Sequence, residues 1–87
     1  MSPRYRVEVS RAAARQIEAL DRTTQARIIS RLETLDEEPR PPTAKKLKGE
    51  HGTWRVRVGD YRIVYTIEDN RLLILVVKVG HRREVYR

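Results

Sequence analysis

The sequence predicts an α+β fold in which a four-stranded sheet carries an antiparallel helical hairpin on one face. The first half of the chain contains two segments of strong helix formers with apolar residues at helical spacing. The second half contains three runs with the composition and alternation of β-strands. With 87 residues the chain suffices for a single domain, residues 1–87, and is too short for two hydrophobic cores.

A short strand is expected near the N-terminus, because residues 4–9 alternate between charged and apolar side chains. Ser10 follows as a candidate N-cap, since its hydroxyl can accept a hydrogen bond from a backbone N–H of the first helical turn. The alanine-rich residues 11–20 then predict the first helix. The buried face of the strand would carry Tyr5, Val7 and Val9.

A second helix is predicted to begin at Asp21 or Thr23, both of which are suitable N-caps. It should end before Pro39, because proline cannot continue a helix. Only a few residues separate the two helices, so they should form an antiparallel hairpin. The apolar stripe of the second helix consists of Ile28, Ile29, Leu32 and Leu35.

The second half of the chain predicts a three-stranded antiparallel meander over residues 54–58, 61–67 and 72–79. Gly59–Asp60 joins the first two strands, with glycine at the first central position as a type II′ turn prefers. Asp69–Asn70 joins the last two, and both residue types tolerate positive φ. The last strand is apolar on both faces, so we expect it at the centre of the sheet, beside the N-terminal strand.

A two-residue turn at Gly59–Asp60 sets the register of its two strands and places Arg57 opposite Arg62. Arg55 shares their face, which is the face that the helices leave open. Like charges directly opposite each other destabilise a sheet, so the pair needs either splaying into water or an anion between them. The other face of these two strands carries Trp54, Val56, Ile63 and Tyr65.

A two-residue turn at Asp69–Asn70 would extend this register to the last strand. It would place Leu75 beside Val64 and Val77 beside Arg62. An exposed apolar floor would then lie beside the arginines, and such a surface favours a bound partner. The floor would consist of Val64, Leu73, Leu75 and Val77.

The charge of the chain points to a polyanionic partner. Nineteen Lys and Arg residues against twelve Asp and Glu give a net charge of +7. Residues 1–40 contribute +1, from eight basic and seven acidic side chains, and residues 41–87 contribute +6, from eleven and five. Fifteen of the basic residues are arginines, whose planar guanidinium suits phosphate. The second half should therefore hold most of the polyanion-binding surface.

Other classes of protein are disfavoured by composition. Cysteine is absent, which excludes disulfides, thiolate zinc sites and thiol nucleophiles. Two histidines without a paired carboxylate motif do not make a metal site, so we expect neither metal nor cofactor. No apolar run approaches the roughly 20 residues of a membrane helix, and the first residues lack the core of a signal peptide. We therefore expect a soluble, cytoplasmic protein.

Three segments taken together resemble the RelE family of the RelE/ParE toxin superfamily. They are Lys45–Gly49, Gly59–Tyr65 and Val79–Arg87, and the resemblance extends over essentially the whole chain. It implies the toxin of a type II toxin–antitoxin pair that inhibits translation as a ribosome-dependent mRNA endoribonuclease (mRNA interferase). In that family the 2′-hydroxyl attacks the adjacent phosphate without metal or cofactor. The implied partners are the ribosome, mRNA and an antitoxin, which we expect to be an acidic protein that covers the apolar floor and the arginines.

The resemblance also implies roles for particular residues. Arg57, Arg62 and Arg82 would stabilise the charge that builds up on the phosphate. Tyr86 would stack on a base, although it could equally be a hydrophobic latch that holds the C-terminal segment on the sheet. Further RNA contacts are expected from Lys45, Lys46, Lys48, Arg55 and Arg83.

One departure from the family concerns proton transfer. Members of the RelE family carry lysines at the positions of Arg55 and Arg57, and one of those lysines is the proposed general base. A guanidinium stays protonated and serves that role poorly. His81 is the better proton shuttle by its chemistry, the alternative being an ordinary surface histidine in a basic segment. Glu84 is a second candidate base, although a salt bridge to a neighbouring arginine would be its more common role.

Two other functions remain open from the sequence. A ParE-like toxin would share the fold and poison DNA gyrase without being an enzyme. That branch typically lacks the C-terminal arginine and tyrosine, whereas this chain has Arg82 and Tyr86. A catalytically weak RNA-binding homologue is the third possibility, because the two lysines are missing. Substituting Arg62 or Arg82 by alanine separates these readings, since a nuclease should then lose growth inhibition.

Overall fold

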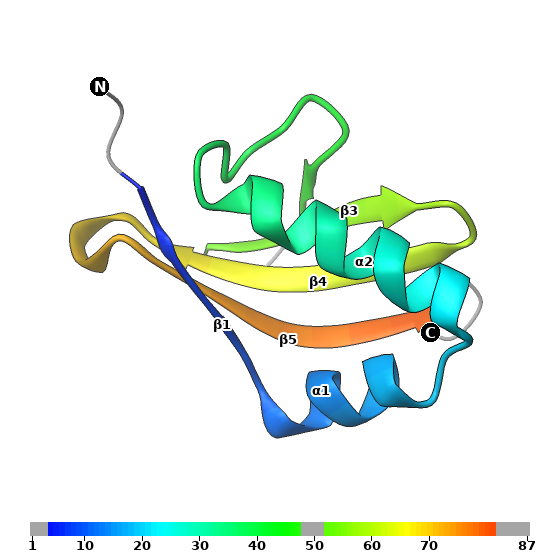
Figure 1. Ribbon diagram of the computed structural model, residues 1–87. Coiled ribbons are helices and arrows are strands. Elements are labelled where there is room, and N and C mark those ends of the chain that lie inside the picture. The colour runs from blue at the N-terminus through cyan, green and yellow to red at the C-terminus, as the bar shows by residue number, and fades with distance from the viewer. Residues whose placement is uncertain (1–3, 48–51, 82–87) are drawn as a thin grey trace.

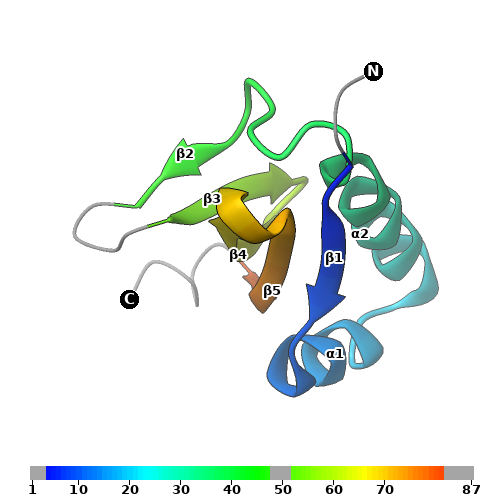
Figure 2. The same cartoon turned by 90° about the vertical axis from the view of Figure 1, so that its left-hand side faces the viewer.

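The protein forms one mixed sheet with two helices on the same side of it (Figures 1 and 2). The structure is a computed structural model that describes residues 4–47 and 52–81. Both helices precede the main run of strands, and the strands lie in the order β1-β5-β4-β3-β2. The predicted α+β class is confirmed. The elements in chain order are β1 (Arg6–Val9), α1 (Arg11–Glu18), α2 (Arg22–Leu35), β2 (Lys45–Lys46), β3 (Thr53–Val58), β4 (Tyr61–Glu68), the 3₁₀ turn η1 (Asp69–Arg71) and β5 (Leu73–His81).

The described sheet has five strands where the sequence predicted four. The additional strand, β2, pairs antiparallel with β3, so that Lys45 lies opposite Arg55 and Lys46 opposite Trp54. The backbone N–H of Leu47 extends the pairing by donating to the carbonyl oxygen of Thr53 at 3.0 Å. Two consecutive exposed lysines show no apolar alternation, so this strand exists through its pairing with β3 and left no local signal in the sequence.

The N-terminal strand lies where the sequence placed it, beside the central strand β5. The two strands run parallel, with Val7 opposite Ile74 and Val9 opposite Val76. Both ends of β1 are tied to this neighbour, because the backbone N–H of Arg6 donates to the Leu72 carbonyl at 2.8 Å and that of Ser10 donates to the Val76 carbonyl at 2.9 Å. This pairing leaves β1 at one edge of the described sheet and β2 at the other.

Side chains fix where the helices begin and how they meet. The Ser10 hydroxyl accepts a hydrogen bond from the N–H of Ala13, and the Asp21 carboxylate accepts one from Thr24, as N-caps do. Asp21, and not Thr23, is therefore the cap of α2. The Gln25 amide donates to the carbonyls at the C-terminal end of α1, at 2.9 Å to Ile17 and 3.2 Å to Glu18. The hairpin is thus held by α2 capping the end of α1.

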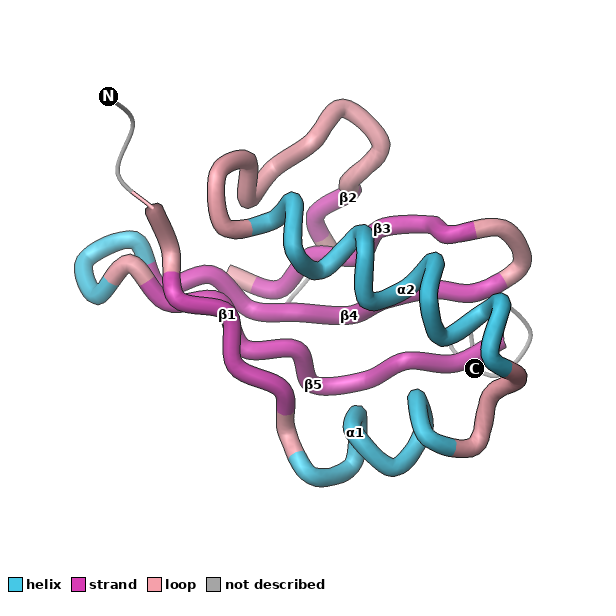
Figure 3. Tube along the Cα trace, viewed as in Figure 1, coloured by secondary structure: helices cyan, strands magenta, loops and turns pink. Residues whose placement is uncertain are grey.

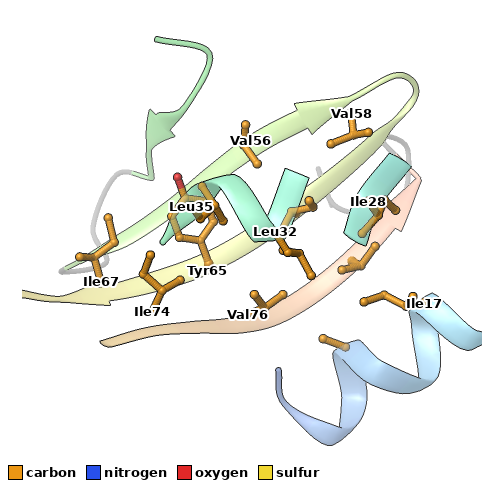
Figure 4. Close-up of a cluster of buried hydrophobic side chains, with 13 residues drawn as sticks. Ile17, Ile28, Leu32, Leu35, Val56, Val58, Tyr65, Ile67, Ile74 and Val76 are labelled. Carbon is orange, nitrogen blue, oxygen red and sulfur yellow. The ribbon is translucent and has the colours of Figure 1, made fainter. Parts of the chain in front are cut away.

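The core lies between the two helices and one face of the sheet (Figure 4). Tyr65 is fully buried at its centre, and its hydroxyl donates to the carbonyl of Pro39 at 2.8 Å. Burial raises the pKa of this phenol to about 12. The remaining buried hydrophobic residues of this cluster are Ala13, Ile17, Ile28, Leu32, Leu35, Val56, Val58, Ile63, Ile67, Ile74, Val76 and Val79.

The turn between β3 and β4 has the predicted form. Gly59 adopts a φ of +61°, and Asp60 does not share the positive φ, as a type II′ turn requires. Consequently the predicted register is confirmed, with Val58 opposite Tyr61 and Arg57 opposite Arg62.

The predicted register between β4 and β5 is wrong. The connection is not a two-residue turn at Asp69–Asn70, because η1 is followed by Leu72 in the left-handed region at φ 50°. Glu68 therefore lies opposite Leu73, and Thr66, not Val64, lies opposite Leu75. The longer connection shifts the pairing by two residues, which keeps each side chain on its expected face.

A β-bulge then shifts the same pair of strands once more. Val76 lies opposite Tyr65 and Lys78 lies opposite Val64, so Val77 is the extra residue of β5. Beyond Val77, the side chains of β5 therefore point to the face opposite to the one that the earlier alternation would give. Gly80 therefore occupies the place beside Arg62 that the sequence had assigned to Val77.

Candidate functional site

Basic side chains gather on the face of the sheet opposite the helices. Arg55 and Arg57 of β3 and Arg62 of β4 alternate with the core residues of their strands, which directs them to the open face. Arg57 and Arg62 lie directly opposite each other, and Arg55 lies opposite Val64. The two strands therefore deliver three guanidinium groups to adjoining positions of one surface.

These side chains line a small pocket of about 130 Å³. Lys45 joins them because β2 places it in register with Arg55. The loop that leads into β2, visible above the sheet edge in Figure 3, adds the hydroxyl of Thr43. The lining found among the described residues contains cations and a hydroxyl and no carboxylate. Such a pocket favours an anion with several oxygen atoms, because arginine forks donate paired hydrogen bonds to phosphate.

The two facing arginines occupy different environments. Arg62 is buried, with 8% of its surface exposed, whereas Arg57 is exposed. The Nε of Arg57 donates to the carbonyl of Gly59 at 3.1 Å, which ties this side chain to the turn. Gly80, the neighbour of Arg62 on β5, contributes no side chain to the same row. Arg62 thus has its position fixed by packing, and Arg57 borders the pocket from the solvent side.

Lys78 extends the basic surface, and the sequence did not identify it. The bulge places Lys78 of β5 opposite Val64 of β4. The same row continues across the sheet to Arg55 of β3 and Lys45 of β2. Neighbouring strands are about 4.8 Å apart, so Lys78 stands roughly 10 Å from Arg55 across the sheet. Only the bulge brings it to this face, and no local sequence signal marks the bulge. Thr43 was missed as well, because it lies in a loop without periodicity.

His81 does not converge with the arginines. It lies opposite Tyr61, and the two rings meet edge to face with their centroids 5.6 Å apart. Tyr61 packs against the core, so this pair belongs to the helix side of the sheet. Arg62, the next residue of β4, points to the other side. The expected role of His81 as proton shuttle beside Arg57 and Arg62 therefore has no support from its position.

The remaining predicted site residues either point away from the pocket or lie outside the described part of the chain. Lys46 lies opposite Trp54 and so alternates away from Lys45. Lys48, Arg82, Arg83, Glu84 and Tyr86 lie outside the described residues.

The expected apolar floor is less exposed than the sequence suggested. Val64 is 8% exposed, and Leu73, Leu75 and Val77 are half-buried. Leu73 and Leu75 do lie on the open face, opposite Glu68 and Thr66. The large hydrophobic side chains that are exposed among the described residues are Val9, Ile29 and Leu72, none of which belongs to this floor.

The loop that carries Thr43 towards the pocket is held by a cluster around Asp69. The Asp69 carboxylate accepts hydrogen bonds from the Tyr5 hydroxyl at 2.5 Å and from Arg40. Arg40, and to a smaller extent Tyr5, lowers the pKa of Asp69. The Arg40 guanidinium also lies over the Trp54 ring, 5.3 Å from its centroid. These contacts anchor the start of the loop to β3, through Trp54, and to the connection between β4 and β5, through Asp69.

Neither a metal centre nor a membrane span is found in the part of the chain that the structure describes. Within residues 4–47 and 52–81, His, Asp and Glu side chains do not gather in threes that could hold a metal ion. None of the helices in those ranges has the length and apolarity needed to cross a membrane.

Comparison with known proteins shows the family. A family model described as the ParE toxin of the type II toxin–antitoxin system parDE matches residues 7–86. The chain belongs to this toxin family. The toxin is also 32% identical over 81 residues to a RelE-like toxin protein of Escherichia coli, with 91% of this chain and 84% of that protein covered. The resemblance to the RelE/ParE superfamily is thereby confirmed.

Solved structures agree with the fold. The toxin is similar to a chain of the RelBE2 toxin–antitoxin complex of Mycobacterium tuberculosis, with a TM-score of 0.80, 30% identity and coverage of 91% and 99% of the two chains. The archaeal RelE–RelB complex of Pyrococcus horikoshii gives a TM-score of 0.81 at 26% identity, covering 90% and 94%. The isolated E. coli RelE toxin gives 0.78 at 27% identity, covering 94% and 90%.

Proposed function

We propose that this toxin is a ribosome-dependent endoribonuclease that cleaves mRNA and so inhibits translation. The observation that carries the proposal is the pocket of Lys45, Arg55, Arg57 and Arg62, whose described lining contains no carboxylate. A phosphodiester gains negative charge on its non-bridging oxygens when a nucleophile attacks phosphorus. Cations already in place stabilise that charge more than the charge of the ground state, and this difference is what accelerates the reaction.

The reaction consists of an internal displacement at phosphorus. The 2′-oxygen of one nucleotide forms a bond to the adjacent phosphorus, and the bond from phosphorus to the 5′-oxygen of the next nucleotide breaks. The products are a 2′,3′-cyclic phosphate and a 5′-hydroxyl. The 2′-hydroxyl loses one proton and the leaving 5′-oxygen gains one, so the protein can contribute both charge stabilisation and proton transfer.

In this proposal the arginines act as an electrostatic clamp. Arg62, fixed by burial, holds one non-bridging oxygen, and Arg57 approaches from the solvent side of the pocket. Arg55 lies in the row of the sheet next to that of Arg57 and Arg62, and it binds the adjoining part of the RNA backbone. Arg82 completes the clamp and Tyr86 stacks on a base, as the RelE resemblance implies.

Lys45 is the proposed donor of the proton to the leaving 5′-oxygen. It is the single lysine in the described lining of the pocket, and an ammonium can release a proton whereas a guanidinium cannot. The group that accepts the 2′-hydroxyl proton has to be one other than these arginines. Glu84 remains a candidate from the sequence, and the position of His81 on the helix side disfavours it.

An acidic antitoxin is the proposed protein partner. The similar structures include the RelBE2 toxin–antitoxin complex of Mycobacterium tuberculosis and the archaeal RelE–RelB complex of Pyrococcus horikoshii. An acidic segment that occupied the basic pocket would gain charge-assisted hydrogen bonds there and exclude the phosphate at the same time. Inhibition and binding would then result from one contact.

The deciding experiment adds the purified toxin to a reconstituted translation reaction on a defined mRNA and maps new 5′ ends by primer extension. Cuts within the codon in the ribosomal A site are expected, and the same mRNA without ribosomes should stay intact. Arg62→Ala and the exposed variant Arg57→Ala should both lose cleavage. Arg71→Ala is the matched control, because Arg71 is an exposed arginine that pairs with Glu68 away from the pocket. Intact mRNA with the wild-type toxin would rule the proposal out.

A second candidate, a ParE-like poison of DNA gyrase, is favoured by the description of the matching family model. It predicts that the toxin inhibits supercoiling by purified gyrase. It also predicts that Arg62→Ala, provided that it folds, leaves growth inhibition in place, whereas a nuclease would lose it.

A further inference from the structure

A second basic groove lies around the sheet edge from the pocket, between α2 and the turn that joins β3 to β4. It has a volume of about 550 Å³. Arg27 and Arg31, one helical turn apart on α2, line it together with Arg57 of β3, and Ser30 and Thr34 add hydroxyl-bearing side chains. Arg57 lines both this groove and the pocket, so the two hollows meet at one side chain.

The charge around α2 is segregated. The side of α2 that faces the β3–β4 turn carries Arg27 and Arg31. The described residues that line the groove on this side include no acidic side chain. A hollow on the β1 side of the helix contains Glu33 of α2, the acidic residues Asp36, Glu37 and Glu38 of the segment that follows the helix, and one basic residue, Arg4. Arg27 and Arg31 of α2 therefore border the groove, whereas the acidic residues gather on the β1 side of the helix and in the segment after it, and this distribution favours a polyanion in the groove.

The arginines that α2 contributes to the groove are not paired with carboxylates of the described residues. Arg27 and Arg31 form no ion pair with any residue in the ranges 4–47 and 52–81, in contrast to Arg4, Arg40 and Arg71. The Arg27 guanidinium lies against the turn, and a Cβ on Gly59 would come within 3.3 Å of its Nη1. The same glycine accepts the hydrogen bond from Arg57, so the turn brings both guanidinium groups to one place.

We propose that this groove binds the phosphate backbone of single-stranded RNA and continues the strand path from the pocket onto α2. The inference deepens the proposed nuclease function and rests on it for the identity of the strand. Successive arginines on α2 stand about 6 Å apart along the helix axis, so they contact the backbone at successive points. An acidic protein segment is a poorer occupant, because the large hydrophobic residues that are exposed in the described part of the chain, Val9, Ile29 and Leu72, do not line the groove and so cannot anchor it.

The test measures binding of a fluorescent single-stranded 2′-O-methyl RNA, which the toxin cannot cleave because the attacking hydroxyl is blocked. The double variant Arg27→Ala/Arg31→Ala should bind roughly tenfold more weakly near 0.1 M salt, and the slope of log affinity against log salt should fall by about 1.4, or 0.7 per lost phosphate contact. Arg27→Lys/Arg31→Lys should recover most of the slope, because the charge is kept.

The matched control is Arg11→Ala/Arg22→Ala, which removes the same charge from exposed first residues of the two helices outside the groove. Its slope should stay close to that of the wild type. A second assay measures how much toxin pellets with small ribosomal subunits. Comparing it with the oligonucleotide assay shows whether the bound backbone belongs to ribosomal RNA or to free message. Weaker binding of the groove variant in either assay supports the inference.

Equal slopes for the groove variant and the control, in both assays, would overturn the inference. It would also be overturned if the groove variant bound RNA normally and instead lost binding of an acidic antitoxin. The failure of the nuclease proposal is recognised separately. A wild-type toxin that binds RNA through Arg27 and Arg31 but cuts no message leaves the groove intact and removes the proposed chemistry.

Discussion

Arg40 and Asp69, 29 residues apart in the chain, form a two-bonded ion pair, with Nη1 and Nη2 of the arginine at 3.2 and 2.8 Å from the two carboxylate oxygens. The pair joins the loop after α2 to the connection between β4 and β5. Because that loop continues to Thr43 and Lys45, the pair helps to set the position of one wall of the basic pocket.

The Asp69 ion pair should make stability depend on acidity. The pKa of Asp69 is lowered from its ordinary value of 3.8, so its contribution is present above that value and is lost as the pH falls through the lower, folded-state pKa. Asp69→Asn should lower the denaturation midpoint at neutral pH and show a weaker decline below pH 3.8 than the wild type. Asp60→Asn is the control, since Asp60 makes no ion pair with the described residues. Parallel acid profiles for Asp69→Asn and the wild type would contradict this expectation.

Lys45 should be needed for its proton as well as its charge. Lys45→Arg keeps the charge beside Arg55 and removes the proton donor, so cleavage on the ribosome should slow about 100-fold, the low end of general acid catalysis. RNA affinity should change little. Single-turnover cleavage at saturating toxin separates the two effects. Lys46→Arg, on the alternate side of β2, serves as the control, and a wild-type rate for Lys45→Arg would exclude the proton-transfer role.

Lys78 should contribute to RNA binding because the bulge places it in the row of Lys45 and Arg55. Lys78→Ala should reduce the salt dependence of single-stranded RNA binding by about 0.7 in the log–log slope. Lys46→Ala removes the same charge from a side chain of β2 that alternates away from Lys45, so it should reduce the salt dependence less. Equal slopes for the two variants would show that the row across the sheet does not bind the backbone.

Gly59 should be required in the turn between the arginine strands. Its φ of +61° is strained for any residue with a Cβ, and that Cβ would meet the Arg27 guanidinium at 3.3 Å. Gly59→Ala should therefore lower the free energy of unfolding by about 1 kcal/mol or more, measured by urea denaturation. Asp60→Ala, at the next turn position without positive φ, should be much milder. An unchanged midpoint for Gly59→Ala would mean that the turn adapts without strain.

The local signals of the sequence determined the two helices, the Ser10 cap and the first hairpin, and they left Asp21 and Thr23 as alternatives for the second cap. Ser10 and Asp21 cap the helices because a short polar side chain satisfies a free N–H within its own turn, and Gly59 sets the turn because only its backbone accepts the positive φ cheaply. From that turn the facing pair of Arg57 and Arg62 follows by counting residues. Such features depend on neighbours within a few residues, so the sequence by itself specified them.

Only the tertiary structure decided which further residues share the pocket's face. β2 exists through hydrogen bonds to β3, and this pairing brings Lys45 beside Arg55. The connection that ends at the left-handed Leu72 shifts the pairing of β5 by two residues, and the bulge at Val77 then turns Lys78 towards the arginines and leaves His81 on the helix side. A strand has a period of two, so one inserted residue reverses every side chain beyond it. That reversal is settled by the packing of Val76 and Val79 into the core, which no short stretch of sequence records.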